Sequence, residues 1–405
     1  MITTSPNLLD PALYLDGVPY DQLRWLREND PVHWHEEPDG GPGFWALTRH
    51  RDVKAVEADS ETFSSEPSTV IVDTVSMSDT GTAKHLIMSD PPHHTAHRRT
   101  LGVELNPIPV RSMREQLQVV VDEIVDDVVE SGACDVTPDL GQKLASYVTA
   151  DLLGLSRPEA IELCEAADVL TRGGSKEEGP GLAAVQVMFR HASTAWQQRR
   201  AAPGDGLLGR LAYASVGDIP MDLTQFSMDF LLLVTAGSDT TRNVVGAGMA
   251  AFFEFPEQHR LLLDDPGLIS GAVEEILRWS TPIVYQRRTA TRDTEVAGQK
   301  IRRGQKVVSY YTAANRDPEV FADPDVFDIR RSPNPHLAFG VGRHFCLGSH
   351  LARLELTLIF QAIMRRMPDI RPAGPVRYRR SPIAPSVLGP VSVPATFTPG
   401  ARLRS

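Results

Sequence analysis

The residues with the clearest capacity for chemistry stand near the C-terminal end of the chain, after a glycine-rich loop. Cys346 follows this loop and comes directly before a helical pattern over 347–367. Glycines allow backbone paths that side chains forbid, and the unpaired N–H groups at the start of a helix stabilise a thiolate. Gly348 leaves room for a flat cofactor against the turn, and Phe339 is placed to shield the sulfur from water. We therefore expect Cys346 to carry a thiolate that faces a cofactor.

A polar cluster in the middle of an apolar segment marks a second candidate site. The segment 222–255 has a long helical pattern that stops at Pro256, yet Asp239 and Thr240 stand near its centre. Such a local contradiction is typical of a functional position. The hydroxyl of Thr240 can donate to the carbonyl of Ala236, which loosens the helix and opens a small groove. An acid beside an alcohol is suited to deliver protons there.

Both stretches resemble signatures of the cytochrome P450 superfamily. The haem-binding signature is matched by Phe339-Gly340-x-Gly342-x-His344-x-Cys346-x-Gly348, and the oxygen-binding motif by Ala236-Gly237-x-Asp239-Thr240. The resemblance extends over about residues 8–393. It implies a cytochrome P450 fold and a haem b whose iron is bound by Cys346, a thiolate that favours O–O cleavage. It also implies that Thr240 hydrogen-bonds the bound dioxygen, that Asp239 supplies protons, and that Ala236, Phe339 and Gly348 contact the haem.

Further residues match positions that hold the haem carboxylates in this family. The stretch Asp90-Pro91-Pro92-His93-His94-Thr95-Ala96-His97-Arg98-Arg99 resembles the family's pattern at the start of a helix. The resemblance assigns four residues to the propionates: His94, Arg98, Arg288 and His344. Two carboxylates in a largely buried pocket need such cations and donors. His93 and His97 have no part in this assignment.

A third pattern concerns the scaffold rather than the chemistry. Glu275 and Arg278 stand three residues apart on one helix face, and Glu274 is also within reach of Arg278, so spacing alone leaves the acid open. The family has a Glu-x-x-Arg pair at this place, and the match falls on Glu275 and Arg278. The resemblance implies a structural role, in which the pair joins an arginine, Arg330, to hold the loop before Cys346.

The elements that position these residues are mostly helical. Apolar residues recur at three- and four-residue steps in seven segments: 113–129, 139–153, 157–170, 182–200, 222–255, 268–279 and 347–367. Strands are few: 32–35 with 43–47 predicts one hairpin, 294–301 with 306–311 a second, and 391–397 an edge strand. The fold class is mainly α with small β-sheets. We expect one domain over 1–405, a helix-rich core with a small β-rich N-terminal lobe.

Composition excludes several classes of partner. The 405 residues carry a net charge of −11, which disfavours nucleic acid. The three cysteines are too few and too scattered for a disulfide framework, which fits a reducing cytoplasm, and Cys134 and Cys164 are expected to be structural. The most apolar stretch carries charges in its centre, so no membrane span is predicted. We expect a cytoplasmic monomer.

Substrate contacts are expected from variable and mostly apolar segments. These are 69–77, 170–188, 232–236, 282–284 and 386–387, with Leu232, Thr235, Ala236, Val284 and Val387 in the pocket. An apolar molecule of medium size is implied: a sterol, terpenoid, lipid or polyketide, with an aromatic demethylation equally open. The run Thr240-Thr241-Arg242-Asn243 resembles sterol- and lipid-oxidising members of the family.

The family resemblance leaves three functional classes to weigh. The first is a monooxygenase that uses O2 and takes electrons from a separate ferredoxin and its reductase, because the chain has no cysteine cluster for an iron–sulfur centre. The second keeps the haem but performs peroxide-driven, coupling or isomerisation chemistry, and its members usually lose the acid–alcohol pair. The third is a non-catalytic haem protein. Asp239 and Thr240 favour the first, and Arg99, Arg343 and Arg353 predict a cationic face for an acidic ferredoxin.

Overall fold

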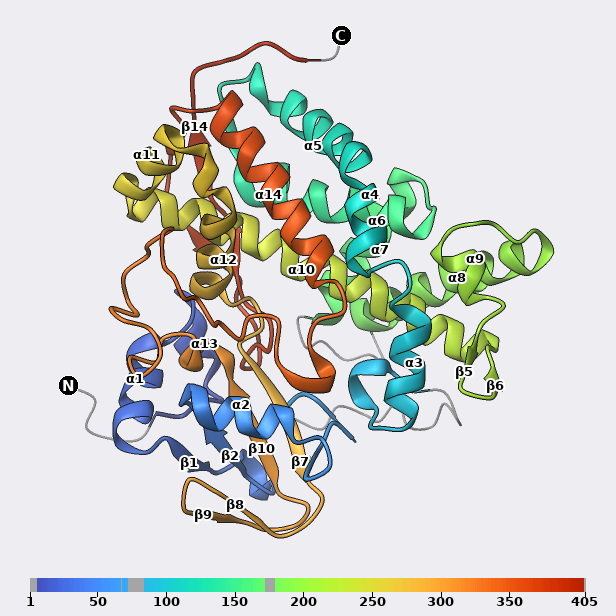
Figure 1. Ribbon diagram of the computed structural model, residues 1–405, viewed down its shortest axis with the longest axis vertical. Helices are drawn as coiled ribbons and strands as arrows, with labels where there is room; N and C mark the ends of the chain where they lie inside the picture. The colour runs from blue at the N-terminus through green and yellow to red at the C-terminus, as the bar shows by residue number, and fades with distance from the viewer. Residues whose placement is uncertain (1–5, 67, 72–83, 172–178, 404–405) are drawn as a thin grey trace.

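The structure is a computed structural model that describes residues 6–66, 68–71, 84–171 and 179–403. Helices dominate the described residues, and the largest sheet gathers at one end of the molecule (Figure 1). The expected class, mainly α with small β-sheets, is confirmed. No helix in these four ranges is long and apolar enough to cross a membrane.

Fourteen α-helices occur in the described part of the chain. They are α1 (Tyr20–Asn29), α2 (His50–Ala58), α3 (His93–Leu101), α4 (Pro107–Ser112), α5 (Arg114–Val129), α6 (Lys143–Leu153), α7 (Arg157–Thr171), α8 (Gly179–Ala201), α9 (Leu207–Leu211), α10 (Leu223–Glu254), α11 (Pro256–Asp264), α12 (Ile269–Ser280), α13 (Tyr311–Ala314) and α14 (Ser349–Arg366). Each of the seven helical segments expected from periodicity overlaps one of them. The segment 139–153 is divided, because a π-helical turn over Val136–Gln142 precedes α6.

The largest sheet has the order β1-β2-β10-β7-β3. Its strands are β1 (Val32–His35), β2 (Phe44–Leu47), β3 (Phe63–Ser64), β7 (Tyr285–Ala290) and β10 (Lys306–Tyr310). The smaller sheets join β4 (Ala133–Asp135), β11 (Arg371–Pro372) and β14 (Pro394–Thr396), and pair β5 (Ser215–Val216) with β6 (Ile219–Pro220), β8 (Thr294–Val296) with β9 (Gln299–Ile301), and β12 (Arg377–Tyr378) with β13 (Pro390–Ser392).

One expected strand pairing is wrong. The hairpin of β1 with β2 is confirmed, but 294–301 does not pair with 306–311. The first of these segments folds back on itself at Gly298, which has a φ of +86° that suits glycine. Strand β10 instead runs antiparallel to β7 and parallel to β2. Periodicity identifies a strand, but the partner depends on contacts far away in sequence.

Helix α10 crosses the centre of the fold (Figure 1). Its 32 residues span roughly 48 Å at 1.5 Å per residue. The carboxylate of Asp222 accepts a hydrogen bond from the amide of Gln225 at 2.8 Å, which caps the first turn. Apolar side chains of α10 join those of α5, α12 and α14 in one core cluster, so the helix that carries the polar cluster has a fixed position.

Candidate active site

Backbone bonds and two glycines hold the loop before Cys346. Gly340 and Gly342 have φ values of +69° and +74°, in the left-handed region. A Cβ at Gly342 would lie 2.8 Å from the carbonyl oxygen of Glu57, so the loop passes too close to α2 for a side chain. The amide of Cys346 donates to the carbonyl of Phe339 at 2.8 Å. This path brings the thiol to the start of α14.

The sulfur of Cys346 is surrounded by groups that suit a thiolate. Burial raises the pKa of the thiol, whereas the backbone N–H of Gly348 and the cations of Arg98 and Arg353 lower it. Such donors and cations are what stabilise a sulfur anion. The other two cysteines, 134 and 164, are also free thiols. Burial raises their pKa values to about 12 and about 11, as expected for structural residues.

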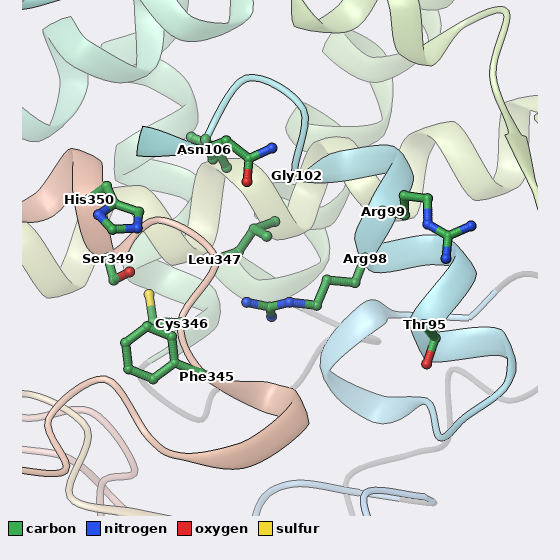
Figure 2. A pocket seen from close by; sticks show the side chains of 11 residues that line it. Thr95, Arg98, Arg99, Gly102, Asn106, Phe345, Cys346, Leu347, Ser349 and His350 are labelled. Carbon is green, nitrogen blue, oxygen red and sulfur yellow. The ribbon is translucent and has the colours of Figure 1, made fainter. Parts of the chain in front are cut away.

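A cavity of about 380 Å³ lies between the loop of Cys346 and helix α3 (Figure 2). Arg98 points from α3 towards this loop, whereas Arg99 points away from it (Figure 2). Phe345 lies beside the sulfur and is exposed. The cavity is lined by Thr95, Arg98, Arg99, Gly102, Leu105, Asn106, Phe345, Cys346, Leu347, Ser349 and His350.

The polar cluster of α10 has the local geometry that the sequence predicts. The hydroxyl of Thr240 donates to the carbonyl of Ala236 at 2.9 Å. Ala236 is exposed, and Thr240 is partly exposed, although Val234 and Ser238 on neighbouring positions are buried. The helix therefore borders an open space along one face, and the hydroxyl of Thr240 stands beside it.

Both carboxylate oxygens of Asp239 have partners from the protein. The hydroxyl of Thr171, at the end of α7, donates to Oδ2 at 2.5 Å. Arg242 forms an ion pair with Oδ1 at 3.0 Å and a second one with Asp168 of α7, also at 3.0 Å. Burial raises the pKa of Asp239, and the charge of Arg242 and the bond from Thr171 oppose this.

Three residues of this network were missed from the sequence. Arg242 lies three positions after Asp239 on one helix face, so the helical period could have identified it. Thr171 and Asp168 could not be found in this way, because Thr171 and Asp239 are 68 positions apart.

Two of the residues assigned to the haem carboxylates have polar groups without a protein partner. His94 is buried, and within the described residues neither ring nitrogen has a hydrogen-bond partner. Burial, followed by the charge of Arg98, lowers the pKa of His94 to about 4. The guanidinium of Arg98 also has no hydrogen-bond or ion-pair partner in the described ranges. Its pKa is lowered by burial and raised by Cys346.

The other two assigned residues are already bonded within the protein. Arg288 donates to Glu57 at 2.5 Å in a buried ion pair. The Nε2 of His344 lies 2.9 Å from the hydroxyl of Ser65, and the centroid of its ring is 4.1 Å from that of His94, with the two rings tilted by 47°. Burial, and then the charge of Arg288, lowers the pKa of His344 to about 3. All four residues thus lie near the loop of Cys346. His94 and Arg98 are free to bind an added carboxylate, whereas Arg288 and His344 already have protein partners.

The residues around Cys346 fit a haem b. Haem b is flat, carries two carboxylates and offers an iron that needs an axial ligand. The thiol of Cys346 would supply the ligand, and the unpartnered nitrogens of His94 and the guanidinium of Arg98 would suit the carboxylates. A Cβ built on Gly348 meets no atom within 4 Å, so the turn leaves space on that side.

The scaffold pair is closed by a different arginine from the one expected. Arg278 donates to both oxygens of Glu275, each at 2.8 Å, rather than to Glu274. Arg331 completes the group, because its Nε lies 3.2 Å from both oxygens of Glu275. The prediction of Arg330 was wrong: that side chain is exposed and bonds to Asp328. The loop has no helical or strand period, so periodicity offers no means of choosing between neighbouring arginines.

The expected cationic face is smaller than predicted. Arg353 does not point outward as a free charge, because it donates to both oxygens of Glu274 at 2.6 and 2.8 Å and covers the ring of Phe339. Arg99 and Arg343 are exposed, and within the described residues neither has a hydrogen-bond or ion-pair partner. The face therefore consists of Arg99 and Arg343.

The residues expected in the substrate pocket divide into open and closed positions. Ala236 is exposed, Thr235 is partly exposed, and Leu232 is 8% exposed on the same face of α10. Val387 is partly exposed and forms a β-bridge with Ile283. Val284 is wrong as a pocket residue, because it is 0% exposed inside an apolar core cluster. Residues 72–77 and 172–178 of the expected segments lie outside the described residues.

Comparisons with known proteins identify the family of this chain. The family model described as cytochrome P450 matches residues 267–367. The steroid C26-monooxygenase of Rhodococcus jostii (strain RHA1) is 34% identical over 387 residues, which cover 93% of this chain and 82% of that protein.

Solved structures extend the similarity to the fold. Mycobacterium marinum cytochrome P450 CYP268A2 in complex with pseudoionone matches with a TM-score of 0.86 at 33% identity, over 93% of this chain and 94% of that one. A mutant of P450 EryK in complex with erythromycin B matches with a TM-score of 0.83 at 28% identity, over 99% of both chains. The expected fold is therefore confirmed. The chain belongs to the cytochrome P450 family, and it is a haem-thiolate monooxygenase.

Proposed function

We propose that this protein inserts one atom of dioxygen into an apolar small molecule, with electrons from a separate ferredoxin and its reductase. The observation that carries the proposal is the acid–alcohol pair of α10. Thr240 stands beside an open face of the helix, and Asp239, the residue before it, lies on the buried side. A haem protein that only binds a ligand needs no such proton donor.

The chain's own residues divide the work of binding and proton transfer. Cys346 would hold the iron, while His94, Arg98, Arg288 and His344 would neutralise the two carboxylates. Haem held in this way supplies dioxygen binding and reductive O–O cleavage. Thr240 would release its bond to the carbonyl of Ala236 and offer its hydroxyl to the reaction space.

Asp239 is proposed as the proton donor behind Thr240. Burial raises its pKa, which favours the protonated form that can give a proton away. Its two oxygens are held by Thr171 and Arg242, so the carboxyl group is oriented before it acts. Proton delivery from this position requires one of these partners to yield.

The proposed substrate is an apolar molecule of the steroid or terpenoid class. Support comes from the apolar residues at the open face of α10, Leu232 and Ala236, and from Ile283 near Val387. Of the relatives above 30% identity, the Rhodococcus jostii protein carries a steroid in its enzyme name, and the Mycobacterium marinum structure holds pseudoionone as its bound ligand. The macrolide complex belongs to a protein of lower identity. We further propose that the protein acts in the cytoplasm as a monomer, which its acidic charge and three scattered cysteines support.

Reconstitution under labelled dioxygen tests the proposed reaction. Purified holoprotein is supplied with ferredoxin, reductase and NAD(P)H under ¹⁸O2, with steroids, terpenoids, fatty acids and macrolides first screened by the spin-state shift that they cause. One ¹⁸O atom in the product of a steroid or terpenoid supports the proposal. Turnover that proceeds with peroxide alone and gains nothing from ferredoxin would assign peroxide-driven chemistry instead. A haem protein that turns over none of these compounds would fit the non-catalytic alternative.

A further inference from the structure

A buried histidine–aspartate pair joins α3 to α10 away from the residues assigned above. Nε2 of His97 lies 2.7 Å from Oδ1 of Asp229, and both side chains are 0% exposed. Burial raises the pKa of Asp229, and the bond from His97 opposes this. The two residues are 132 positions apart in sequence. They therefore fix the distance between two helices that the chain does not connect locally.

Gln225 completes the contact and extends it to a third segment. Its Nε2 donates to the same Oδ1 of Asp229 at 3.1 Å and to the carbonyl of Lys84 at 3.0 Å. Its Oε1 accepts from the amide of Lys84, also at 3.0 Å. Oδ1 of Asp229 thus accepts two hydrogen bonds, while Oδ2 has no partner among the described residues. The direction of the contact is therefore set by a single atom, Oδ1 of Asp229.

The contact matters because α3 also carries two of the residues assigned to haem. His94 and Arg98 are four positions apart and share one face of the helix, whereas His97 stands about 100° from Arg98 around the axis. Only His94, His97 and Leu101 of the nine residues are buried. Leu101 and Ala96 pack against an apolar cluster, and the hydroxyl of Thr100 donates to the carbonyl of Ser215 at 2.9 Å. The bond of His97 is the contact of α3 whose two side chains are both fully buried, so it opposes rotation of the helix from the inner side.

An apolar pair at these positions would hold two helices together equally well. Replacement of a buried ion pair by apolar side chains of similar volume is often neutral or stabilising. What apolar contacts do not supply is a preferred direction, which a hydrogen bond between fixed atoms does. A buried hydrogen-bonded contact in this place is therefore better suited to set orientation than to add stability.

We propose that the His97–Asp229 pair is a positioning device that fixes the rotation of α3 on α10 and thereby aims Arg98 and His94 at the haem. The inference rests on the proposed roles of Arg98 and His94. Arg98 points towards the loop of Cys346 (Figure 2), so a turn of α3 would move its charge relative to both the carboxylates and the sulfur. His97 and Asp229 act through these residues and do not touch the haem themselves.

Three variants separate orientation from charge and from stability. In Asp229→Asn, Oδ1 still accepts from His97 and Gln225, and the amide nitrogen replaces an oxygen that has no partner, so the direction remains without the charge. Asp229→Leu removes both bonds. The double variant His97→Leu with Asp229→Leu restores an apolar contact without a direction. The control is the buried pair of Arg366 and Asp126, 6% and 8% exposed, which joins α14 to α5. It is replaced in Arg366→Met with Asp126→Leu.

The measurements are the rate of haem release to a scavenging apo-globin, the reduction potential and the midpoint of thermal unfolding. We expect Asp229→Leu and the double variant to release haem roughly 10-fold faster, the scale seen when a residue that orients a ligand is lost. The reduction potential should shift in the same variants that release haem faster. The double variant should unfold at the wild-type temperature, Asp229→Asn should keep the wild-type release rate, and the control pair should leave release unchanged.

Two results would overturn the proposal. One is a double variant that releases haem at the wild-type rate, because direction would then be irrelevant. The other is equal acceleration in Asp229→Asn and Asp229→Leu, because charge would then be the cause. A wild-type protein without a thiolate spectrum would instead refute the haem assignment itself, so the two failures are distinguishable.

Discussion

The two halves of the candidate site differ in how their polar groups are satisfied. On the side of Cys346, the sulfur, both nitrogens of His94 and the guanidinium of Arg98 lack side-chain partners in the described residues. On the side of α10, Oδ2 of Asp239 accepts a hydrogen bond from Thr171, while Oδ1 has no hydrogen bond among the described residues but forms an ion pair with Arg242 at 3.0 Å. Buried polar groups are normally paired, so the first arrangement indicates groups reserved for a ligand.

The second arrangement indicates control of a proton instead. A carboxyl group whose bonds come from the protein has a fixed direction and a shifted pKa before any substrate arrives. Arg242 holds Asp239 and Asp168 together, which connects α10 with α7. The comparison predicts that substitutions beside Cys346 impair the binding of haem. Substitutions beside Asp239 should instead leave substrate binding intact and slow the reaction.

The largest effect is expected on the side of Cys346. Cys346→Ser should abolish the red-shifted carbon-monoxide spectrum of the reduced protein, because a serine hydroxyl does not supply the thiolate's electron donation. Cys134→Ser and Cys164→Ser should keep that spectrum, since both thiols stand apart from the cavity. An unchanged spectrum in Cys346→Ser would refute the ligand assignment.

A smaller effect is expected on the side of Asp239. Asp239→Asn should slow turnover by roughly 10²-fold, the usual scale for losing a positioned proton donor. Thr240→Ala should keep substrate binding and NAD(P)H consumption but divert much of the oxygen to peroxide. Product formation, peroxide and the substrate-induced spin shift are measured together. Full rate and full coupling in both variants would remove the acid–alcohol pair from the mechanism.

Glu355 allows a further test because it lies on α14, between the side of Cys346 and the side of α10. It is 5% exposed, and the hydroxyl of Thr241 donates to it at 3.1 Å. Burial raises its pKa from 4.5 to about 8, opposed by the bond from Thr241. The folded protein therefore binds one proton more than the unfolded chain between these two values. Stability should fall as pH rises through that interval, by about 1.4 kcal/mol per unit.

Glu355→Gln removes this dependence without removing the bond from Thr241. The midpoint of thermal unfolding is measured across the same pH interval for both proteins. The unfolding midpoint of the variant should rise relative to that of the wild type as pH increases. Glu257→Gln, at an exposed glutamate of α11, should run parallel to the wild type. Parallel curves for Glu355→Gln as well would contradict a buried neutral acid.

The sequence predicted those features that depend on neighbours within one helical turn or one loop. This class includes the bond of Thr240 to Ala236, the helix α10 and the loop of Cys346. In each of them the spacing of residues along the chain determines which residues come into contact. The link of Thr171 to Asp239, the contact of His97 with Asp229 and the parallel pairing of β10 with β2 join distant segments, and no local period encodes them. Arg331 took the place expected for Arg330 because one residue of register in an irregular loop is invisible to such patterns.

The smallest effect is expected from substitution of Arg99 and Arg343. These two arginines test whether the cations near Cys346 divide into inward ones that bind haem and outward ones that attract the ferredoxin. Both line a second cavity beside α3, of about 710 Å³, which is bordered by Pro91 and Thr95. They are exposed and unpaired within the described residues, whereas Arg98 points inward and Arg353 is bonded to Glu274. A cationic face on a protein of net charge −11 would attract an acidic ferredoxin to this end of the molecule.

Reversal of these two charges should therefore slow the first electron transfer and nothing else. Arg99→Glu with Arg343→Glu is expected to lower the second-order rate of reduction by ferredoxin roughly 10-fold at low salt. The effect should fade as salt rises, since the screening length falls from about 30 Å at 0.01 M to about 8 Å at 0.15 M. Arg260→Glu with Arg303→Glu makes the same change in net charge elsewhere and should reduce the rate far less. Stopped-flow reduction measures this, and substrate affinity should stay constant. Equal rates for wild type and the first double variant at low salt would exclude this face, and with it the division of the arginines into inward and outward roles.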